Sequence, residues 1–366
     1  MITGSFPPIR CGIGDYTSHL SDYLAKRLLS LTVLTSSTAV KARPDDLVLP
    51  LVDRWDIRRM FFVLNTVRSL GPDIVHIQYP ANGYGYRLGP QALAILLRIA
   101  GFPIVTTIHE FTRAKLLRKA SILPFIACSH ALIFTAEEEQ NAVRKAVPWI
   151  KRKLAAARVI PVGSNIPVTA APMKRVPGTT VLSFFGLFYP GRMIESVAEA
   201  FHMISKQITS PVLFRFIGDV HPHHRGYFLK IKALVEHLLP QQQIDWVLGG
   251  TPEDIAAALK GSDACLLPYP DGASFRRTTL MAALSLGIPV VTTKTGSTPA
   301  ELKDGQHVVF ASDEDHLADA VMTVVRDKSL AKKLSENSIA LSERFSWEMI
   351  ADEHIRVYET LLHTER

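Results

Sequence analysis

The chain has 366 residues and a mass of 40.5 kDa, more than one hydrophobic core usually organises, so two domains are expected. Hydrophobic residues make up 47% of the sequence and charged residues 20%, a composition that excludes a largely disordered chain. The formal net charge is +7, and it is concentrated in residues 1–170, which hold 21 Lys and Arg against 11 Asp and Glu.

The three cysteines are far apart in the sequence. Cys11, Cys128 and Cys265 lack the spacing of a metal site or a disulfide framework, which favours a reducing compartment. The first residues show no signal-peptide pattern, and no apolar run is long enough to span a membrane. We therefore expect a cytoplasmic protein that is soluble or bound peripherally at the inner face of the membrane.

Much of the positive charge in the first half lies in two groups of residues. They are Arg113, Lys115, Arg118 and Lys119, followed by Arg144, Lys145, Lys151, Arg152 and Lys153. Three interpretations are open: contact with an anionic membrane, recognition of an anionic acceptor, or solvated helix faces, which is the plainest. Nucleic-acid binding is not expected, because the basic runs lack interleaved aromatic residues and a recognition motif.

The first half of the chain alternates between two periodicities. Short β-branched runs predict buried strands at 30–35, 74–78, 104–108, 131–135 and 159–162. Helical patterns lie between them at 15–27, 56–70, 90–99 and 136–146. This order predicts a doubly wound parallel sheet, which we assign to an N-terminal Rossmann-like domain at 1–168.

A second alternating series follows the proline-rich segment 167–178, which is typical of a linker. Strands are predicted at 180–185, 212–217, 244–247, 264–267, 290–293 and 308–310. Helices are predicted at 193–208, 228–239, 252–260, 279–286 and 315–326, with a capping pattern at 251–254. The second Rossmann-like domain is expected at 169–345, and a terminal helix at 346–366 that packs back on the first domain. Ligands of such sheets bind at the loops that follow the carboxyl ends of the strands.

A glycine pair opens the first helical pattern. Gly12, Ile13 and Gly14 would let backbone N–H groups approach a phosphate or sugar at the positive end of a helix. The third glycine of the dinucleotide fingerprint is missing, and residues 32–38 hold no acid to bind a ribose. A nicotinamide enzyme is therefore disfavoured, and a tight turn is the alternative explanation of the pair.

Several segments in the same order resemble the retaining glycosyltransferases of family 4, which have the GT-B fold of two Rossmann-like domains facing a cleft. The segments are 6–14 (with Phe-Pro-Pro and Gly-x-Gly), 75–79, 107–110, 160–165, 185–187 before Arg192, 263–268 and 287–291. The resemblance covers nearly the whole chain. It implies transfer of a sugar from a nucleotide-diphosphate donor, without a cofactor or metal, to a glycan, lipid-linked or small-molecule acceptor.

The resemblance also implies roles for particular residues. His109 matches a strand-end histidine of the donor-sugar pocket, and Arg192 matches the cation that neutralises the diphosphate leaving group. A fixed cation would stabilise that developing charge without a metal. A structural histidine and an ordinary first-turn arginine are the alternatives. The expected donor-binding residues are Gly12, Ile13, Gly14, Gly163, Ser164, Asn165, Gly186, Gly218, Ser274, Arg276, Arg277, Thr278 and Thr279.

The sequence departs from the family's pattern between residues 271 and 287. The family's two glutamates, separated by seven residues, are replaced by Ser274 and Ala282. An arginine pair, Arg276 and Arg277, enters the following helix and could clamp the diphosphate. A surface arginine pair and a degenerate, inactive site are the alternatives.

Two further groups of residues contain side chains that can bind metals, but neither predicts a metal site. His221, His223 and His224 lack carboxylates at ligand spacing, so a solvated loop is the simpler interpretation. The acidic triplet 313–315 precedes a helix and is expected to cap it. No metal is predicted.

Two rival functions remain open at this point. The missing glutamates suggest a non-catalytic GT-B protein that binds a partner or glycan. A sugar-nucleotide epimerase or a phosphorylase of the same architecture is the second rival, although no segment identifies the pyridoxal lysine that a phosphorylase requires.

Overall fold

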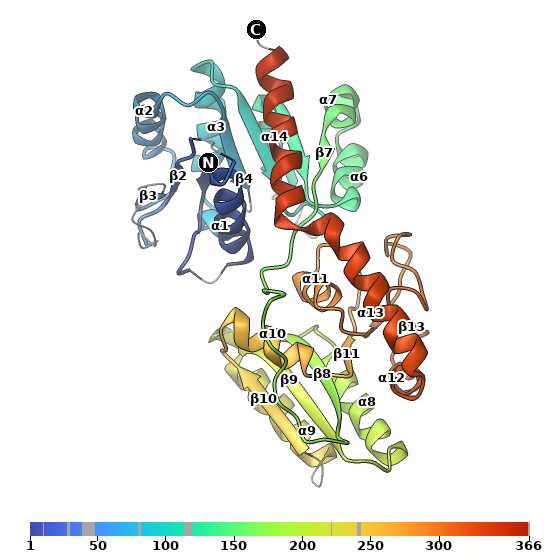
Figure 1. The fold of residues 1–366 in the computed structure, drawn as a ribbon. Helices are drawn as coiled ribbons and strands as arrows, with labels where there is room; N and C mark the ends of the chain where they lie inside the picture. The colour runs from blue at the N-terminus through green and yellow to red at the C-terminus, as the bar shows by residue number, and fades with distance from the viewer. Residues whose placement is uncertain are drawn as a thin grey trace. The chain divides into compact units, whose positions relative to one another are not determined.

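The chain folds into two compact α/β units, seen in a computed structural model (Figure 1). The structure describes residues 1–9, 11–27, 30–38, 48–79, 82–112, 119–220, 222–239 and 243–364. One unit comprises Met1–Gly163 together with Trp347–Arg366, and the other comprises Ser164–Ser346. The first boundary therefore follows Gly163 rather than residue 168, and the terminal segment of the first unit begins at Trp347 rather than at residue 346.

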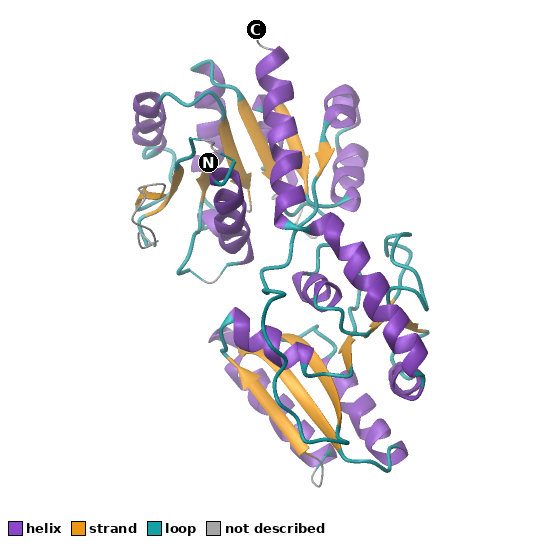
Figure 2. Ribbon diagram, viewed as in Figure 1, coloured by secondary structure: helices purple, strands orange, loops and turns teal. Residues whose placement is uncertain are grey.

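The first unit is built on a seven-stranded parallel sheet with the order β3-β2-β1-β4-β5-β6-β7. Its strands are β1 Ile2–Thr3, β2 Val33–Ser36, β3 Val48–Val52, β4 Val75–Tyr79, β5 Ile104–Ile108, β6 Ala131–Phe134 and β7 Arg158–Val159. Its helices are α1 Gly12–Ala25, α2 Met60–Leu70, α3 Gly89–Ile99, α5 Leu123–Cys128, α6 Glu137–Ala146, α7 Lys151–Ala156 and α14 Trp347–Thr364. Figure 2 shows strands in orange and the helices that flank them in purple.

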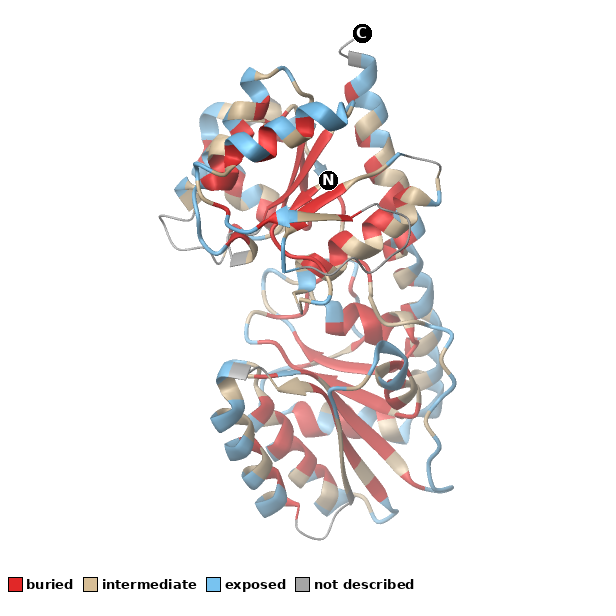
Figure 3. Cartoon of the chain, turned by 90° about the vertical axis from the view of Figure 1, so that its left-hand side faces the viewer, coloured by how far each residue is buried: buried red, intermediate tan, exposed pale blue. Residues whose placement is uncertain are grey.

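Helices cover both faces of this sheet because its central strands are apolar on both sides. Every residue of β4 and β5 is buried. One core joins the sheet to α2, α3 and α5, and a second core joins the sheet to α1 and α14. Figure 3 shows this layering as buried strands beneath helices with exposed outer faces.

The terminal helix α14 contributes polar side chains to the core of the first unit. His354 accepts a hydrogen bond at Nε2 from the Tyr16 hydroxyl (3.3 Å) and donates from Nδ1 to the Ile350 carbonyl (2.7 Å). The Tyr358 hydroxyl lies 2.6 Å from Nδ1 of His76, on β4. These contacts, with the packing of Trp347 against Tyr16, make α14 an integral part of the first unit.

Acid should therefore weaken the first unit. Burial lowers the pKa of His354 to about 4, and burial followed by the charge of His354 lowers the pKa of His76 well below its usual value. These rings stay neutral when folded but charge near pH 6.5 when unfolded, so stability present above that pH is lost as pH falls toward 4. We expect His354 alone to cost about 2 kcal/mol at pH 5.

Chemical denaturation at pH 7 and pH 5 checks this expectation. His354→Gln should flatten the pH dependence of the unfolding free energy. His363→Gln, at an exposed position on the same helix, should leave it unchanged. An unfolding free energy that is equal at the two pH values would contradict the prediction.

The second unit is built on a six-stranded parallel sheet with the order β10-β9-β8-β11-β12-β13. Its strands are β8 Thr180–Phe188, β9 Val212–Val220, β10 Gln243–Leu248, β11 Ala264–Leu267, β12 Val290–Thr293 and β13 Val309–Ala311. Its helices are α8 Ile194–Gln207, α9 Arg225–Leu238, α10 Pro252–Lys260, α11 Thr278–Ser285, α12 Leu317–Arg326 and α13 Lys328–Ser342.

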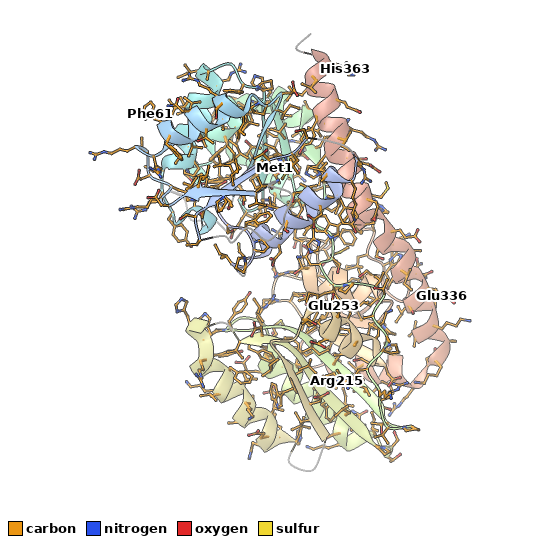
Figure 4. All side chains as sticks on the ribbon, turned by 60° about the vertical axis from the view of Figure 1, so that its left-hand side comes forward. Met1, Phe61, Arg215, Glu253, Glu336 and His363 are labelled. Carbon is orange, nitrogen blue, oxygen red and sulfur yellow. The ribbon has the colours of Figure 1, made fainter. Side chains whose placement is uncertain are left out.

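One buried arginine ties two layers of the second unit together. Arg215, labelled in Figure 4, is only 2% exposed on β9. Its Nε donates to Asp245 on β10 (2.8 Å), and its Nη1 donates to the carbonyl of Ala258 on α10 (2.9 Å). The charge is thereby paired and hydrogen-bonded, as burial of a guanidinium requires.

Several predicted elements differ from the observed ones at their ends or in detail. The predicted capping pattern is confirmed: Thr251 accepts from the Asp254 backbone N–H and Asp254 accepts from the Thr251 N–H. A 3-10 turn at Glu343–Phe345 separates α13 from α14. Arg113, Lys115, Arg118 and His221 lie outside the described residues.

Candidate active site

Two facing glycines form the floor of the candidate donor site in the second unit. Gly186 on β8 pairs in register with Gly218 on β9, near the carboxyl ends of both strands. The φ angle of Gly218 is 149°, and a Cβ added there would lie 1.8 Å from the Gly186 carbonyl oxygen. Only glycine fits this position, because both its conformation and its surroundings exclude a side chain.

Arg192 projects from the loop that follows β8, before α8 begins. Its guanidinium carbon lies 5.0 Å from the centre of the Tyr189 ring, and a Cβ at Gly186 would lie 3.9 Å from its Nη2. The buried Nε of Arg192 has no hydrogen-bond acceptor among the described residues. A buried guanidinium nitrogen left without an acceptor is suited to an anionic ligand.

A tyrosine that the sequence reasoning missed organises the loop after β11. The Tyr269 hydroxyl lies 2.9 Å from Oγ1 of Thr279, at the start of α11. Its backbone N–H donates to Oγ1 of Thr293 (2.8 Å), which in turn donates to the Tyr269 carbonyl (2.6 Å). Burial raises the pKa of Tyr269 to about 12, against the opposing influences of Thr279, Arg192 and Arg277. Both arginines thus lie close enough to act on the same phenol.

The arginine pair has partners within its own loop. Arg277 forms an ion pair with Asp271, and its guanidinium carbon lies 4.7 Å from the centre of the Tyr269 ring. Arg276 donates to Oγ of the buried Ser274 through its backbone N–H (3.2 Å) and its Nε (3.4 Å). The structure thus gives both arginines a role in shaping the loop, and a diphosphate clamp by them remains a prediction.

The start of α11 presents backbone donors at the end of this loop. Thr278 is exposed and Thr279 is buried, and Arg277 at the N-cap position supplies no side-chain cap. An uncapped helix start offers backbone N–H groups to an anion.

Three of the predicted residues lie at the boundary between the two units in the sequence. Gly163 ends the first segment, and Ser164 and Asn165 begin the second unit. The Ser164 hydroxyl accepts the backbone N–H of Ile166 (3.1 Å), so this serine shapes its own turn. The buried Oδ1 of Asn165 has no donor among the described residues. Asn165 is therefore the member of this group with capacity for a ligand.

In the first unit, the glycine pair opens α1. Cys11 at the N-cap makes no side-chain hydrogen bond to the helix, so Gly12, Ile13 and Gly14 begin it uncapped. A Cβ at Gly14 would lie 3.2 Å from the backbone of Ser5 and Phe6, whereas a Cβ at Gly12 would meet nothing within 4 Å. The close contact with the backbone of Ser5 and Phe6 explains why a glycine stands at position 14. No such contact restricts Gly12, which faces open space.

His109 follows β5 and lies beside the helix that the glycines open. Its ring meets the edge of Tyr16, on α1, with 5.0 Å between ring centres. Its Nε2 lies 2.7 Å from Oε1 of Gln78, which only accepts, so Nε2 carries the proton and Nδ1 presents a lone pair. Burial, followed by the charge of His354, lowers the pKa of His109 to about 3. The imidazole is therefore neutral at physiological pH.

A cavity of about 430 Å³ lies at the carboxyl ends of β1 to β4 in the first unit. Its lining combines backbone near Gly4 and Gly83 with Trp55 and three charged residues, Asp53, Arg54 and Arg87. Such a mixture of aromatic surface and cationic groups suits a polar, anionic molecule.

The structure shows no metal-like group among the residues it describes. No cluster of three His, Cys, Asp or Glu side chains is placed to hold a metal there. Asp313 accepts the backbone N–H groups of Asp315 and His316 and pairs with the His316 ring, so it orders the turn before α12. The expected cap by the acidic triplet is not formed, because the N-cap residue of α12 is His316 and no side chain caps the helix. Nor does any helix of the described chain have the length and apolarity to cross a membrane.

Comparison with known proteins matches both units to one family. The model for glycosyl transferases group 1 matches residues 174–340, and the model for Glycosyltransferase Family 4 matches residues 11–165. The chain belongs to glycosyltransferase family 4. The transferase is also 27% identical over 301 residues to a phosphatidyl-myo-inositol mannosyltransferase of Mycobacterium leprae, covering 79% of this chain and 74% of that protein.

Solved structures identify the fold of the transferase as GT-B. A glycosyltransferase from Rickettsia africae is 14% identical with a TM-score of 0.76, covering 97% of this chain and 96% of that one. Anabaena HepE, solved with UDP and glucose, is 15% identical with a TM-score of 0.70, covering 94% and 96%. The predicted family, fold and enzyme class are thus confirmed.

Proposed function

We propose that the transferase moves a sugar, with retention of anomeric configuration and without a metal, from a nucleotide-diphosphate donor to a glycan or lipid-linked acceptor. The observation that carries the proposal is the unpaired, buried Nε of Arg192 beside the Gly186–Gly218 floor. Departure of a nucleoside diphosphate develops negative charge, which this fixed cation and the start of α11 are suited to stabilise. The UDP in the HepE structure is consistent with such a donor.

The proposed step balances without a cofactor. The bond between the anomeric carbon and the β-phosphate oxygen breaks, and a bond to the acceptor oxygen forms on the same face of the sugar. The acceptor proton passes to the departing phosphate oxygen. This front-face course suits the chain because Ser274 and Ala282 stand where the family has its two glutamates.

His109 is the proposed sugar-contacting residue of the first unit. As a neutral ring with a free Nδ1 lone pair, it can accept a hydrogen bond from a sugar hydroxyl without adding charge. Its orientation is fixed by Gln78 and Tyr16, so little ordering entropy is lost on binding.

The acceptor is proposed to carry an anionic group that binds the 430 Å³ cavity of the first unit. Arg54 and Arg87 outnumber the one acid at its wall, Asp53, and favour a phosphate or carboxylate, and Trp55 offers a face for a sugar or polyol ring. The Mycobacterium relative is named for a phosphorylated lipid acceptor, which agrees with this choice. A lipid-linked acceptor would bring the enzyme to a membrane, so peripheral contact with an anionic membrane belongs to the same proposal.

Calorimetric titration with UDP, GDP, ADP and dTDP tests the donor part. We expect one nucleoside diphosphate to bind clearly more tightly than the others, with binding unchanged by EDTA. NMR of the product formed from the corresponding sugar nucleotide should show the donor's anomeric configuration. Binding of none of the four would contradict the proposal and favour a non-catalytic GT-B protein, and an inverted product would contradict retention.

A further inference from the structure

The two most exposed large hydrophobic side chains of the described chain both lie in the first unit. Ile99 is 78% exposed at the end of α3, and Trp149 is 75% exposed in the turn Pro148–Ile150 between α6 and α7. An isolated exposed leucine needs no explanation, but a tryptophan so fully exposed does. Tryptophan is enriched at the boundary between water and lipid headgroups, because its indole has both a large apolar surface and a polar N–H.

Both side chains emerge at the same edge of the sheet. In a parallel sheet, each connecting helix starts near the carboxyl end of one strand and ends near the amino end of the next. α3 leads from β4 to the amino end of β5, and α6 and α7 lead from β6 to the amino end of β7. This edge is opposite the strand ends that carry His109 and the 430 Å³ cavity.

Basic side chains lie on or next to the elements that carry the two hydrophobic ones. The Arg98 guanidinium contacts the ring of His130, at the amino end of β6, and Lys153 on α7 donates to the Ala127 carbonyl (2.9 Å). Burial and then the charge of Arg98 lower the pKa of Lys153, so these two cations lie within electrostatic reach. Arg144 and Lys145 are exposed on the last turn of α6.

A cavity of about 560 Å³ opens beside two of these groups, His130 and Lys153. His130, Lys153 and Arg158 line it together with residues 155–157 of α7 and the chain after it and residues of α14. None of the described residues that line it is acidic. The sequence shows the same bias, because no Asp or Glu occurs from residue 140 to residue 194. A cavity lined by cationic side chains and by no acidic ones is complementary to phosphate groups.

We propose that this amino-end patch, formed by Arg98, Ile99, His130, Trp149, Lys153 and Arg158, docks the protein on an anionic membrane. Trp149 and Ile99 enter the headgroup layer, and the cavity receives a lipid phosphate between Lys153 and Arg158. The patch lies at the edge of the sheet opposite the proposed acceptor cavity, so this docking goes beyond the proposed function and does not rest on the lipid nature of the acceptor.

An anionic membrane fits this patch better than a nucleic acid or a protein partner. Single-stranded nucleic acids need several aromatic platforms beside the charge, and Trp149 is the one aromatic side chain of the patch. A stable protein interface has an apolar core depleted of charge, whereas this patch holds more cationic side chains than apolar ones. Interfacial aromatic residues next to basic ones are the usual composition of a membrane-surface site.

Vesicle sedimentation of the full chain tests the proposal. One set of vesicles is phosphatidylcholine alone, and the other holds equal parts of phosphatidylcholine and phosphatidylglycerol. We expect binding only to the anionic vesicles, weakened by added salt. Trp149→Ser should reduce the partition coefficient about tenfold or more, and Lys153→Gln or Arg158→Gln about fivefold each.

Matched variants in the second unit serve as controls. Met203→Ser and Lys206→Gln alter exposed residues of α8 and should leave vesicle binding unchanged. Nucleotide binding measured on the same preparations reports folding and the donor site, so failure of docking is distinguished from failure of the proposed function. Equal binding to both vesicle types, anionic binding unaffected by Trp149→Ser, or tighter binding to RNA than to anionic vesicles would overturn the proposal.

Discussion

Replacing Arg192 with alanine should lower turnover about 100-fold and weaken binding of the nucleoside diphosphate at least about tenfold. The reason is that, without a ligand, the buried Nε of Arg192 has no acceptor among the described residues. A guanidinium whose Nε has no acceptor can give that donor to the leaving diphosphate. Arg277 cannot substitute fully, because it already pairs with Asp271.

Two variants separate this effect from a general loss of charge or stability. Arg192→Lys keeps the charge but not the planar fork, so it should recover part of the turnover and less of the affinity. Arg326→Ala removes an exposed arginine at the end of α12 in the same unit and should change neither quantity. Unchanged turnover and affinity in Arg192→Ala would show that another group neutralises the diphosphate.

Gly218→Ala is expected to be the most damaging single methyl addition in the second unit. The new Cβ would lie 1.8 Å from the Gly186 carbonyl oxygen, and the residue would have to keep a φ of 149°. Backbone strain and the forced separation of β8 from β9 should together cost more than about 3 kcal/mol. Nucleotide binding should be lost with it, because the same two strands carry the floor of the site.

Thermal unfolding and nucleotide titration of the purified variant measure both effects. Gly226→Ala is the matched control, since a Cβ at this position in α9 meets nothing within 4 Å. There alanine should stabilise the helix by up to about 1 kcal/mol. A Gly218→Ala protein that melts and binds nucleotide like the parent would refute the close approach of the two strands.

Apolar runs were sufficient to predict the central strands of both sheets. The predicted bounds of β5, β11 and β12 agree with the observed ones, because these strands are buried on both faces and contain no interrupting residue. β3 was missed because Pro50 interrupts its pattern, and its position at the edge of the sheet explains why proline is tolerated. α5 was missed because it is six residues long and has a proline, Pro124, as its second residue.

The candidate site was less accessible to sequence reasoning than the fold. Motif resemblance pointed to Gly186 and Gly218 separately, but only strand register shows that one glycine leaves room for the other. The role of Tyr269 depends on Thr279 and Thr293, which come from other elements, so its position after β11 gave no local signal. The ion pair of Arg277 with Asp271 likewise arises from the turn of the loop.

The first unit is formed by two separate segments of the chain, and this affects how it folds during synthesis. A ribosome releases residues in order, and the second unit is one uninterrupted stretch, Ser164–Ser346. Its chain is complete while the first unit still lacks α14, whose Tyr358 and His354 are partners of buried His76 and Tyr16. The half that emerges first must therefore wait to finish folding, with an apolar face open to chaperones until the last helix leaves the exit tunnel.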